Sequence, residues 1–267
     1  MTEFKRCYPD ANNFDKVIKI HNVDNWNCKY FSIDKDYGYW ITDPPFDIKH
    51  FEIFKNLIAS FPIQKDNSAI TNFDPNPFDS IHLPEWIYKD ICNLLIDFYS
   101  KNISDDIYLE QIHEWGNLYF SKLTKPISCW RIPHLDYVHG LVTNLWFTNH
   151  PLDMSCTKLF HYEGKIYETV YDFQVDKTHK LHKQWAELSK NASRADSWFN
   201  IPDEELKKWG FNLLASIPTV EKTMTMYKAN IPHLAYVSTE VDFRWSHSFA
   251  FSFIPKPKTL NDLRYAF

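Results

Sequence analysis

Two segments in the first 100 residues have the hydrophobic period of an amphipathic helix. In residues 51–61, apolar side chains stand at positions 51, 54, 57, 58 and 61. Residues 84–100 repeat the pattern at positions 87, 91, 94, 95 and 98, and Pro84 suits an early helical position. Apolar residues with this spacing share one side of an α-helix. The sequence therefore predicts two helices that pack against a core.

From residue 107 onward the pattern becomes typical of β-strands. Aromatic and β-branched residues gather in short runs that turn-forming residues separate. The predicted strands are 109–122, 127–132, 141–148, 157–162, 223–229, 233–238 and 243–254. Two further strands are predicted near the N-terminus, at 17–20 and 37–41, and a loop rich in Asn, Asp, Ser and Pro at 62–84.

Residues 175–216 interrupt the strands with two predicted helices, at 175–190 and 202–215, the second of which has acidic residues in its first turn. No linker or internal repeat divides the chain. We therefore expect an α+β protein with one domain over residues 1–267. Residues 1–106 would support a β core at 107–254 that contains a helical insert at about 175–216.

Composition excludes several classes of function. Hydrophobic residues make up 44% of the chain and aromatics 17%, which favours a folded, aromatic-rich interior. Only five glycines are present, and neither GxGxxG nor GxxxxGK[ST] occurs, so phosphate-binding loops are not expected. A net charge of −5 gives no general attraction to nucleic acid or to a membrane surface.

The pattern of cysteines indicates a reducing compartment. The five cysteines are dispersed and lack CxxC spacing, which fits buried thiols better than disulfides or a zinc ribbon. No secretory signal and no membrane span are visible. The expected location is cytoplasmic.

The candidate chemistry begins with a histidine and an acid two residues apart. Such residues share a face of an extended segment and can reach one metal ion. Three pairs have this spacing: His50/Glu52, His134/Asp136 and His161/Glu163. His134 directly follows proline, as does the distant His233, and a preceding proline favours an extended entry into a strand.

The strand at 243–253 singles out one of these pairs. Its alternation places aromatic residues and His247 on one face, which suggests a packing role for His247. The other face combines Arg244 with small residues, including Ser246. A buried arginine needs an anion. Arg244 and Ser246 can together hold a carboxylate through charge-assisted hydrogen bonds, although Arg244 could instead pair with a buried acid of the protein.

His-x-Asp, a distant His and then Arg-x-Ser resembles the pattern of the Fe(II)/2-oxoglutarate-dependent oxygenases. The resemblance covers about residues 107–254, and its most specific parts are Arg-Ile-Pro-His-Leu-Asp and Asn-Ile-Pro-His. It implies a double-stranded β-helix, or jelly-roll. The two histidines stand 99 positions apart, a separation that varies widely in the superfamily.

The resemblance also implies roles for single residues. His134, Asp136 and His233 would be the catalytic iron ligands, while Arg244 and Ser246 would hold the far carboxylate of 2-oxoglutarate, with O₂ as the second co-substrate. Related halogenases replace the carboxylate ligand by a small residue, so Asp136 implies hydroxylation.

The remaining candidates have competing interpretations. Asn144 could contact 2-oxoglutarate or substrate, or form a cross-strand hydrogen bond. Glu114, Asn117 and Trp146 are candidate substrate contacts, with ordinary sheet positions as the alternative. His50/Glu52 is expected at a helix start, with a structural or surface role. His161/Glu163 stands before Gly164, which indicates a turn, yet it could pair with His233.

Three hypotheses of function follow. The first is a 2-oxoglutarate-dependent dioxygenase that hydroxylates a small polar metabolite, with a free amino acid favoured. The second keeps the chemistry but makes a protein side chain the substrate. The third is a cupin-like protein that binds a metal or ligand without catalysis. Nucleic acid and membranes are not expected as partners under any of them.

Overall fold

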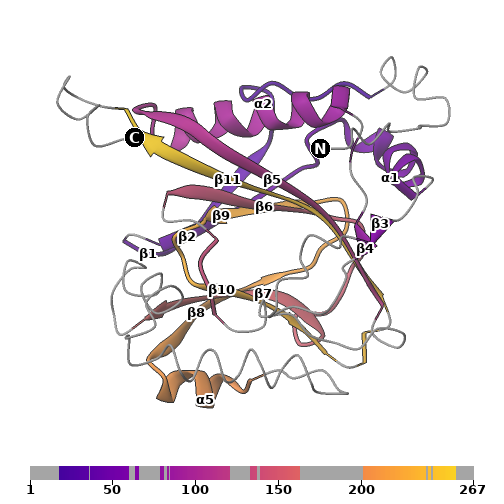
Figure 1. The fold of residues 1–267 in the computed structure, drawn as a ribbon. Coiled ribbons are helices and arrows are strands. Elements are labelled where there is room, and N and C mark those ends of the chain that lie inside the picture. Colours follow the sequence, from indigo (N-terminus) through magenta and orange to yellow (C-terminus); the bar gives the residue numbers. More distant parts are fainter. Residues whose placement is uncertain are drawn as a thin grey trace.

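The computed structural model of the protein describes residues 18–35, 37–59, 64–65, 79–80, 83, 85–120, 133–136, 139–162, 201–238, 240–241 and 243–256. For residues 64–65, 79–80, 115–120 and 243 it describes the backbone alone. Two antiparallel sheets face each other, with helices outside both of them (Figure 1). This arrangement is consistent with a jelly-roll.

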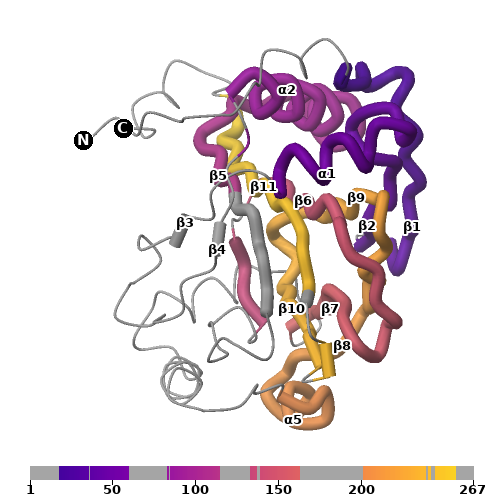
Figure 2. The backbone as a smooth tube through the Cα atoms, turned by 90° about the vertical axis from the view of Figure 1, so that its right-hand side faces the viewer, coloured from indigo at the N-terminus to yellow at the C-terminus, as the bar shows by residue number. Residues whose placement is uncertain are grey.

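The larger sheet has eight strands in the order β1-β2-β9-β6-β11-β5-β4-β3. Figure 2 shows this order from β1 at one edge as far as β5. The strands are β1 (Cys28–Asp34), β2 (Tyr37–Thr42), β3 (Gln64–Lys65), β4 (Asp79–Ser80), β5 (Ile107–Phe120), β6 (Gly140–Trp146), β9 (Met224–Lys228) and β11 (Phe243–Pro255). The longest of these, β5 and β11, pair along almost their whole length.

The smaller sheet has three strands in the order β10-β7-β8. They are β7 (Ser155–Tyr162), β8 (Phe211–Pro218) and β10 (His233–Val237). A core between the two sheets, called the inter-sheet core below, contains Tyr37, Val142, Leu159, Ile217, Tyr227, Ala229, Ile231 and Ala250. Because these residues come from both sheets, their burial holds the sheets face to face.

Helices α1 (Phe51–Ala59) and α2 (Glu85–Asn102) cover the outer face of the larger sheet, where α1 follows the short 3-10 helix η2 (Ile48–His50) (Figure 1). Their apolar stripes pack with the aromatic residues of β11 in one buried cluster. The two helices predicted from the hydrophobic period are thus confirmed. Of the helices in the described ranges, none combines the length and apolar character needed to cross a bilayer.

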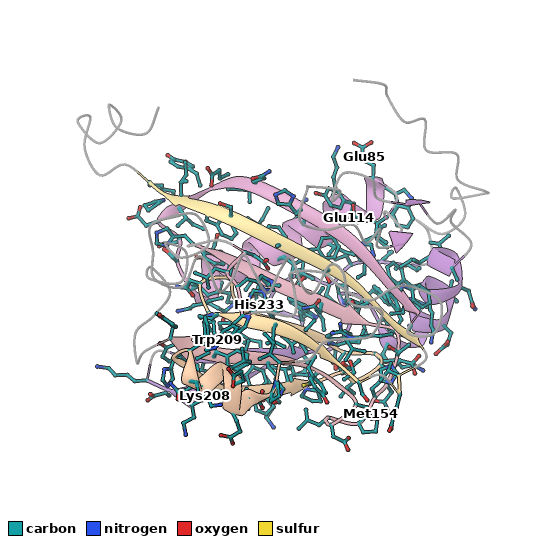
Figure 3. All side chains as sticks on the ribbon, turned by 60° about the horizontal axis from the view of Figure 1, so that its bottom comes forward. Glu85, Glu114, Met154, Lys208, Trp209 and His233 are labelled. Carbon is teal, nitrogen blue, oxygen red and sulfur yellow. The ribbon has the colours of Figure 1, made fainter. Side chains whose placement is uncertain are left out.

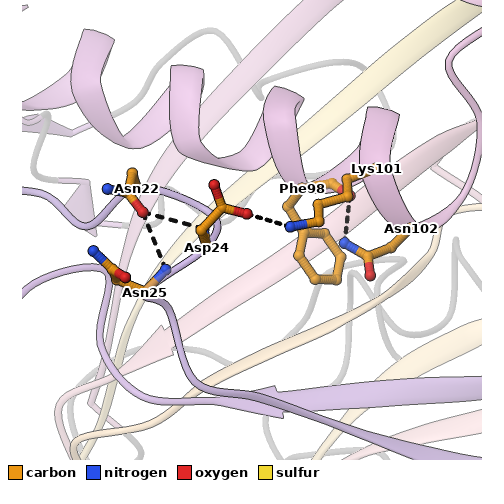
Figure 4. Close-up of polar contacts among 6 residues, drawn as sticks. All are labelled: Asn22, Asp24, Asn25, Phe98, Lys101 and Asn102. Atoms are coloured by element: carbon orange, nitrogen blue, oxygen red, sulfur yellow. Dashed lines mark hydrogen bonds and ion pairs between the residues drawn. The ribbon is translucent and has the colours of Figure 1, made fainter.

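The C-terminal end of α2 is tied to the turn that precedes β1 (Figure 4). Asn22 closes this turn, because its side-chain oxygen accepts hydrogen bonds from the backbone N–H groups of Asp24 and Asn25 at 3.2 and 3.0 Å. Asp24 then forms an ion pair with Lys101 in the last turn of α2. This exposed ion pair joins the turn before β1 to the end of the helix that covers the sheet.

Most of the predicted strands are confirmed with boundaries shifted by a few residues. Strands β2, β5, β6, β7, β9, β10 and β11 occupy segments predicted as strands. The segment 17–20 is different, because its described part forms only a single bridge between Ile20 and Phe46. Strand β1 was not predicted. The strand predicted at 127–132 and the helix predicted at 175–190 lie outside the described residues.

The helix predicted at 202–215 is half wrong. Helix α5 (Asp203–Lys208) ends after six residues, and Gly210 has a φ of 92°, a left-handed conformation that favours glycine and ends the helix. The following residues form β8, which pairs with β7. Residues 211–216 therefore belong to the β core and not to a helical insert. Helix α5 lies outside the smaller sheet, where Leu206 packs with Phe160.

The three described cysteines are free thiols, as expected: Cys92 and Cys156 are buried and Cys28 is half-buried. Burial raises the pKa of Cys28 and Cys92 to about 12. These two thiols therefore remain protonated, and unreactive as nucleophiles, at neutral pH. Cys7 and Cys129 lie outside the described residues.

Strand β11 has two different faces, as its alternation predicts. Phe249, Phe251 and Phe253 join the outer cluster beneath the helices. Ala250, on the opposite face, lies in the inter-sheet core. Because side chains alternate along a strand, Arg244 and Ser246 share the inner face with Ala250. The polar side of β11 therefore faces the interior between the sheets.

Candidate metal centre

Backbone pairing brings His134 and His233 together. Each N–H donates a hydrogen bond to the carbonyl of the other residue at 3.0 Å, which forms an isolated antiparallel bridge. Directly opposed residues project their side chains to the same face. The two imidazole centroids accordingly lie 4.6 Å apart. Two histidines 99 positions apart in the sequence thus become immediate neighbours.

Asp136 completes a group of three. It stands two residues after His134, so an extended backbone directs both side chains to one side. Its Oδ1 lies 3.7 Å from Nε2 of His134, and its Oδ2 lies 3.3 Å from Nε2 of His233. One ligand atom from each of the three residues lies within 4.8 Å of the others. Among the described residues, this is the group of His, Cys, Asp and Glu side chains that is close enough to hold a metal ion.

These distances fit a divalent ion. Two ligands at right angles, each about 2.1 Å from a metal, lie about 3 Å apart. In addition, Nδ1 of His233 lies 2.9 Å from the carbonyl oxygen of Ile231, to which it can donate a hydrogen bond. With Nδ1 donating to this carbonyl, Nε2 is the nitrogen left for a metal, an arrangement typical of metal-binding histidines. The residues present therefore suit a metal ion.

The group is buried and its carboxyl group is ionised. His134 and His233 are 6% and 5% exposed. Burial alone would raise the pKa of Asp136, but the neighbouring imidazoles, His233 foremost, outweigh it and lower this pKa below its ordinary value. A carboxylate between two imidazoles concentrates negative charge where a cation would sit.

Arg244 and Ser246 lie on the facing sheet and are 8% and 1% exposed. The guanidinium carbon of Arg244 lies 4.7 Å from the ring centroid of Trp146, a cation–π contact. Trp146 is fixed in turn by a hydrogen bond from its Nε1 to the hydroxyl of Thr225 at 3.2 Å. Trp146 thus supports Arg244, a role that differs from the substrate contact considered from the sequence.

Asn144 forms a cross-strand hydrogen bond. Its Oδ1 accepts a bond from the hydroxyl of Ser248 on β11 at 2.6 Å. The cross-strand hydrogen bond considered for Asn144 is therefore present. A contact between Asn144 and 2-oxoglutarate or substrate stays a prediction.

Glu114 is not part of the site. Phe249 is its partner in the register between β5 and β11, so the two side chains share the outer face. Its Oε1 lies 2.9 Å from Nε2 of His247 and accepts a hydrogen bond from the N–H of Leu83 at 2.6 Å. Figure 3 shows Glu114 on the side of the sheet that bears α2, apart from His233. The predicted substrate contact is wrong because β5 directs this side chain away from the interior.

The position of Glu114 gives a prediction for stability. We expect Glu114→Gln to lower the free energy of unfolding by about 1 kcal/mol, because neutral hydrogen bonds replace charge-assisted ones to His247 and Leu83. Urea denaturation of the variant and the wild type measures the difference. Affinity for small-molecule ligands should be unchanged in Glu114→Gln, and a loss of ligand binding without a loss of stability would contradict this placement.

The other candidates are separated from the site or not fully described. Asn117 pairs with Ser246 in the backbone register, but its side chain lies outside the described residues. His50 ends η2 and Glu52 lies in α1, where it forms an ion pair with Lys222 at 2.8 Å. His161 lies on β7. Glu163 lies outside the described residues.

The sequence interpretation did not include two interior residues. Tyr227 is 2% exposed, and its ring meets the imidazole of His233 edge-on, with centroids 4.9 Å apart. His113 on β5 pairs with Ala250 and is close enough to Asp136 to contribute to the lowered pKa of its carboxyl group. Both residues are placed by strand register, which no local motif reveals.

No protein family model matches the sequence, and no curated protein sequence is similar enough to match it. Several solved structures are loosely similar. The non-heme alpha ketoglutarate dependent carbocyclase SnoK from nogalamycin biosynthesis is 9% identical, with a TM-score of 0.43 over 93% of this chain and 94% of that one. The epimerase SnoN from the same biosynthesis is 10% identical, with a TM-score of 0.36 over 84% and 82% of the chains.

A third similar structure is EvdO2 from Micromonospora carbonacea var. aurantiaca, complexed with 2-oxoglutarate. It is 11% identical, with a TM-score of 0.42 over 88% of this chain and 98% of that one. Because identities and TM-scores are low for all three, these similarities assign no function to this chain.

Proposed function

We propose that the protein is an Fe(II)- and 2-oxoglutarate-dependent oxygenase that acts on a small molecule. One observation supports this most strongly: a His-Asp-His group whose two histidines are buried accompanies a buried Arg-Ser pair on the inner face of β11. The first group suits a cation and the second suits an anion. A co-substrate that has a metal-chelating end and a carboxylate end would satisfy both.

The type of ligands favours iron(II). Two imidazoles and one carboxylate form the facial triad of non-haem Fe(II) oxygenases, in which open positions remain for other ligands. His134, Asp136 and His233 would hold the ion, and the bound iron would supply the activation of O₂. Structural zinc sites, in contrast, usually have four protein ligands.

The other interior residues would bind and orient 2-oxoglutarate. The guanidinium of Arg244 and the hydroxyl of Ser246 can donate charge-assisted hydrogen bonds to the carboxylate far from the metal. Trp146 holds the guanidinium plane in position through the contact described above. The burial of Arg244 and Ser246 strengthens these electrostatic interactions.

For the reaction, we propose hydroxylation. Oxidation of 2-oxoglutarate to succinate and CO₂ would be coupled to insertion of one oxygen atom into a C–H bond, with the second oxygen atom of O₂ entering succinate. Asp136 supports hydroxylation over halogenation, since the related halogenases lack this carboxylate. The burial of His134 and His233 favours a small substrate over a protein segment.

The narrower proposal for the substrate is a free amino acid. Incubation with Fe(II), 2-oxoglutarate and each amino acid tests it through succinate release and a product heavier by one oxygen atom. Turnover of a peptide in place of every free amino acid would favour a protein side-chain hydroxylase instead.

Anaerobic titration tests the proposed cofactors without knowledge of the substrate. Addition of 2-oxoglutarate to the Fe(II)-loaded protein should produce a weak visible charge-transfer band that saturates at one equivalent. Mn(II) replaces Fe(II) as the control, since it binds similar ligands without this band. A protein that binds Fe(II) but gives neither the band nor succinate would be a metal-binding protein without oxygenase activity, and the proposal would be wrong.

A further inference from the structure

The backbone of Trp146 is held from both sides. Its N–H donates a hydrogen bond to the carbonyl of Thr223 at 3.0 Å, and its carbonyl accepts one from the N–H of Lys222 at 3.2 Å. The next residue, Phe147, donates to the carbonyl of Trp245 on β11 at 3.0 Å. The end of β6 therefore lies between the turn that precedes β9 and strand β11. The freedom that remains to Trp146 is the orientation of its indole about the side-chain torsions.

Thr225 on β9 fixes this orientation. The indole Nε1 donates a hydrogen bond to the hydroxyl of Thr225 at 3.2 Å. Trp146 is fully buried and Thr225 is 1% exposed, so solvent has little access to the bond. Threonine is branched at Cβ, which restricts its side-chain torsion, and the acceptor therefore has a defined position. The hydrogen bond selects one orientation of the indole ring.

The indole ring in turn contacts Arg244. The guanidinium carbon of Arg244 lies 4.7 Å from the centroid of the ring, a distance at which the ring electrons attract the cation. Trp146 is also the direct partner of Ser246 in the register between β6 and β11. The indole therefore adjoins both members of the Arg-Ser pair, and its orientation determines where the guanidinium can rest.

We propose that Thr225 is a positioning residue of the co-substrate site, which acts through the indole of Trp146 on the guanidinium of Arg244. The inference rests on the function proposed above. Thr225 has this effect without contact to 2-oxoglutarate. It fixes how far the guanidinium stands from the metal ligands, and thereby the length of the 2-oxo diacid that can span both ends. Discrimination of this kind requires binding groups held to within roughly 0.5 Å by their supporting residues.

A role of Thr225 in packing alone makes the opposite prediction. Valine has nearly the shape of threonine but no hydrogen-bond acceptor, whereas serine keeps the acceptor and lacks one methyl group. If Thr225 positions Trp146, Thr225→Val is the damaging change and Thr225→Ser stays close to the wild type. If Thr225 only fills space, Thr225→Ser is the worse of the two, because it leaves a cavity.

Calorimetric titration of the Mn(II)-loaded protein measures the effect without turnover. The two ligands are 2-oxoglutarate and 2-oxoadipate, which is longer by one methylene group. We expect Thr225→Val to raise the dissociation constant for 2-oxoglutarate on the order of 5-fold, because the buried indole N–H loses its acceptor. The preference for 2-oxoglutarate over 2-oxoadipate should fall as well, since a guanidinium that can shift accommodates the longer acid.

Thr143→Val is the matched control. It makes the same chemical change in a fully buried residue of β6 whose hydroxyl has no hydrogen-bond partner within the described part of the chain. Thr143 pairs with Met226, so its side chain lies on the opposite face of the sheet from Thr225. This variant should keep the wild-type affinities for both acids. Metal affinity without a 2-oxo acid should be unchanged in every variant, because the candidate ligands do not come from β6 or β9.

The outcomes separate this inference from the function on which it rests. An unchanged affinity and length preference in Thr225→Val would overturn the inference, and so would a Thr225→Ser variant that is impaired more than Thr225→Val. Equal losses of metal affinity and 2-oxoglutarate affinity, with a shifted urea unfolding curve, would assign Thr225 a general structural role and contradict the relay. A wild type that binds Mn(II) but neither acid would refute the proposed function together with this inference.

Discussion

Asp136→Asn is expected to reduce succinate formation more than about 100-fold, since the loss of a residue next to a ligand already costs 10- to 100-fold in metal affinity or activity. The substitution preserves the size of the side chain but removes the charge between His134 and His233. Those two imidazoles would remain in place, because their backbone bridge does not depend on the carboxylate. The loss should therefore appear as weaker metal binding in a protein that is still folded.

The measurement is a calorimetric titration with Fe(II) or Mn(II), together with succinate release. Asp153→Asn makes the same chemical change at an exposed position before β7 and should match the wild type in both assays. If Asp136→Asn keeps more than a tenth of the wild-type metal affinity and activity, Asp136 is not a metal ligand. Unchanged unfolding curves would show that lost binding does not arise from lost structure.

Arg244→Met should raise the KM for 2-oxoglutarate at least about 30-fold, because truncation of one partner in a buried charge pair costs 2–5 kcal/mol. Methionine retains apolar contact with Trp146 but has no donor for a carboxylate. Arg244→Lys should have an intermediate effect, since it keeps the charge and loses the planar fork that suits a carboxylate.

Steady-state kinetics and anaerobic titration with 2-oxoglutarate measure this effect. Lys207→Met removes an exposed cation from α5 and serves as the control, with no change expected. Metal affinity should stay constant in Arg244→Met, since Arg244 is not among the candidate ligands. A variant that keeps its affinity for 2-oxoglutarate would show that Arg244 has a structural role, such as pairing with an acid of the protein.

The sequence predicts those elements whose local pattern and tertiary environment agree. Helices α1 and α2 have continuous apolar stripes, and β11 alternates clearly, so all three are found where expected. Strand β8 was missed because leucine and alanine favour helices in isolation. Its pairing with β7 overrides that propensity, as tertiary contacts often do.

The site was predictable where two of its residues are close in the sequence, and not where their contacts depend on the register between strands. His134 and Asp136, or Arg244 and Ser246, are two residues apart, so the sequence alone places each pair on one face. The contacts of Tyr227 depend on how β9 lies relative to β6 and β10, which no spacing reveals. The spacing of Glu114 and Asn117 already argues against a shared site. They stand three positions apart, so a regular strand directs their side chains to opposite faces.

The two faces of β11 differ in how they contribute to folding and to the interior. Its outer aromatic residues contribute most to folding, because they are buried beneath α1 and α2. Its inner positions are small and polar, and Ser248 and Ser252 contribute little apolar burial. Mutations at the inner positions would then alter the shape and polarity of the interior between the sheets without removing the aromatic residues that pack beneath the helices. The inner face of β11 is therefore a suitable target for directed evolution.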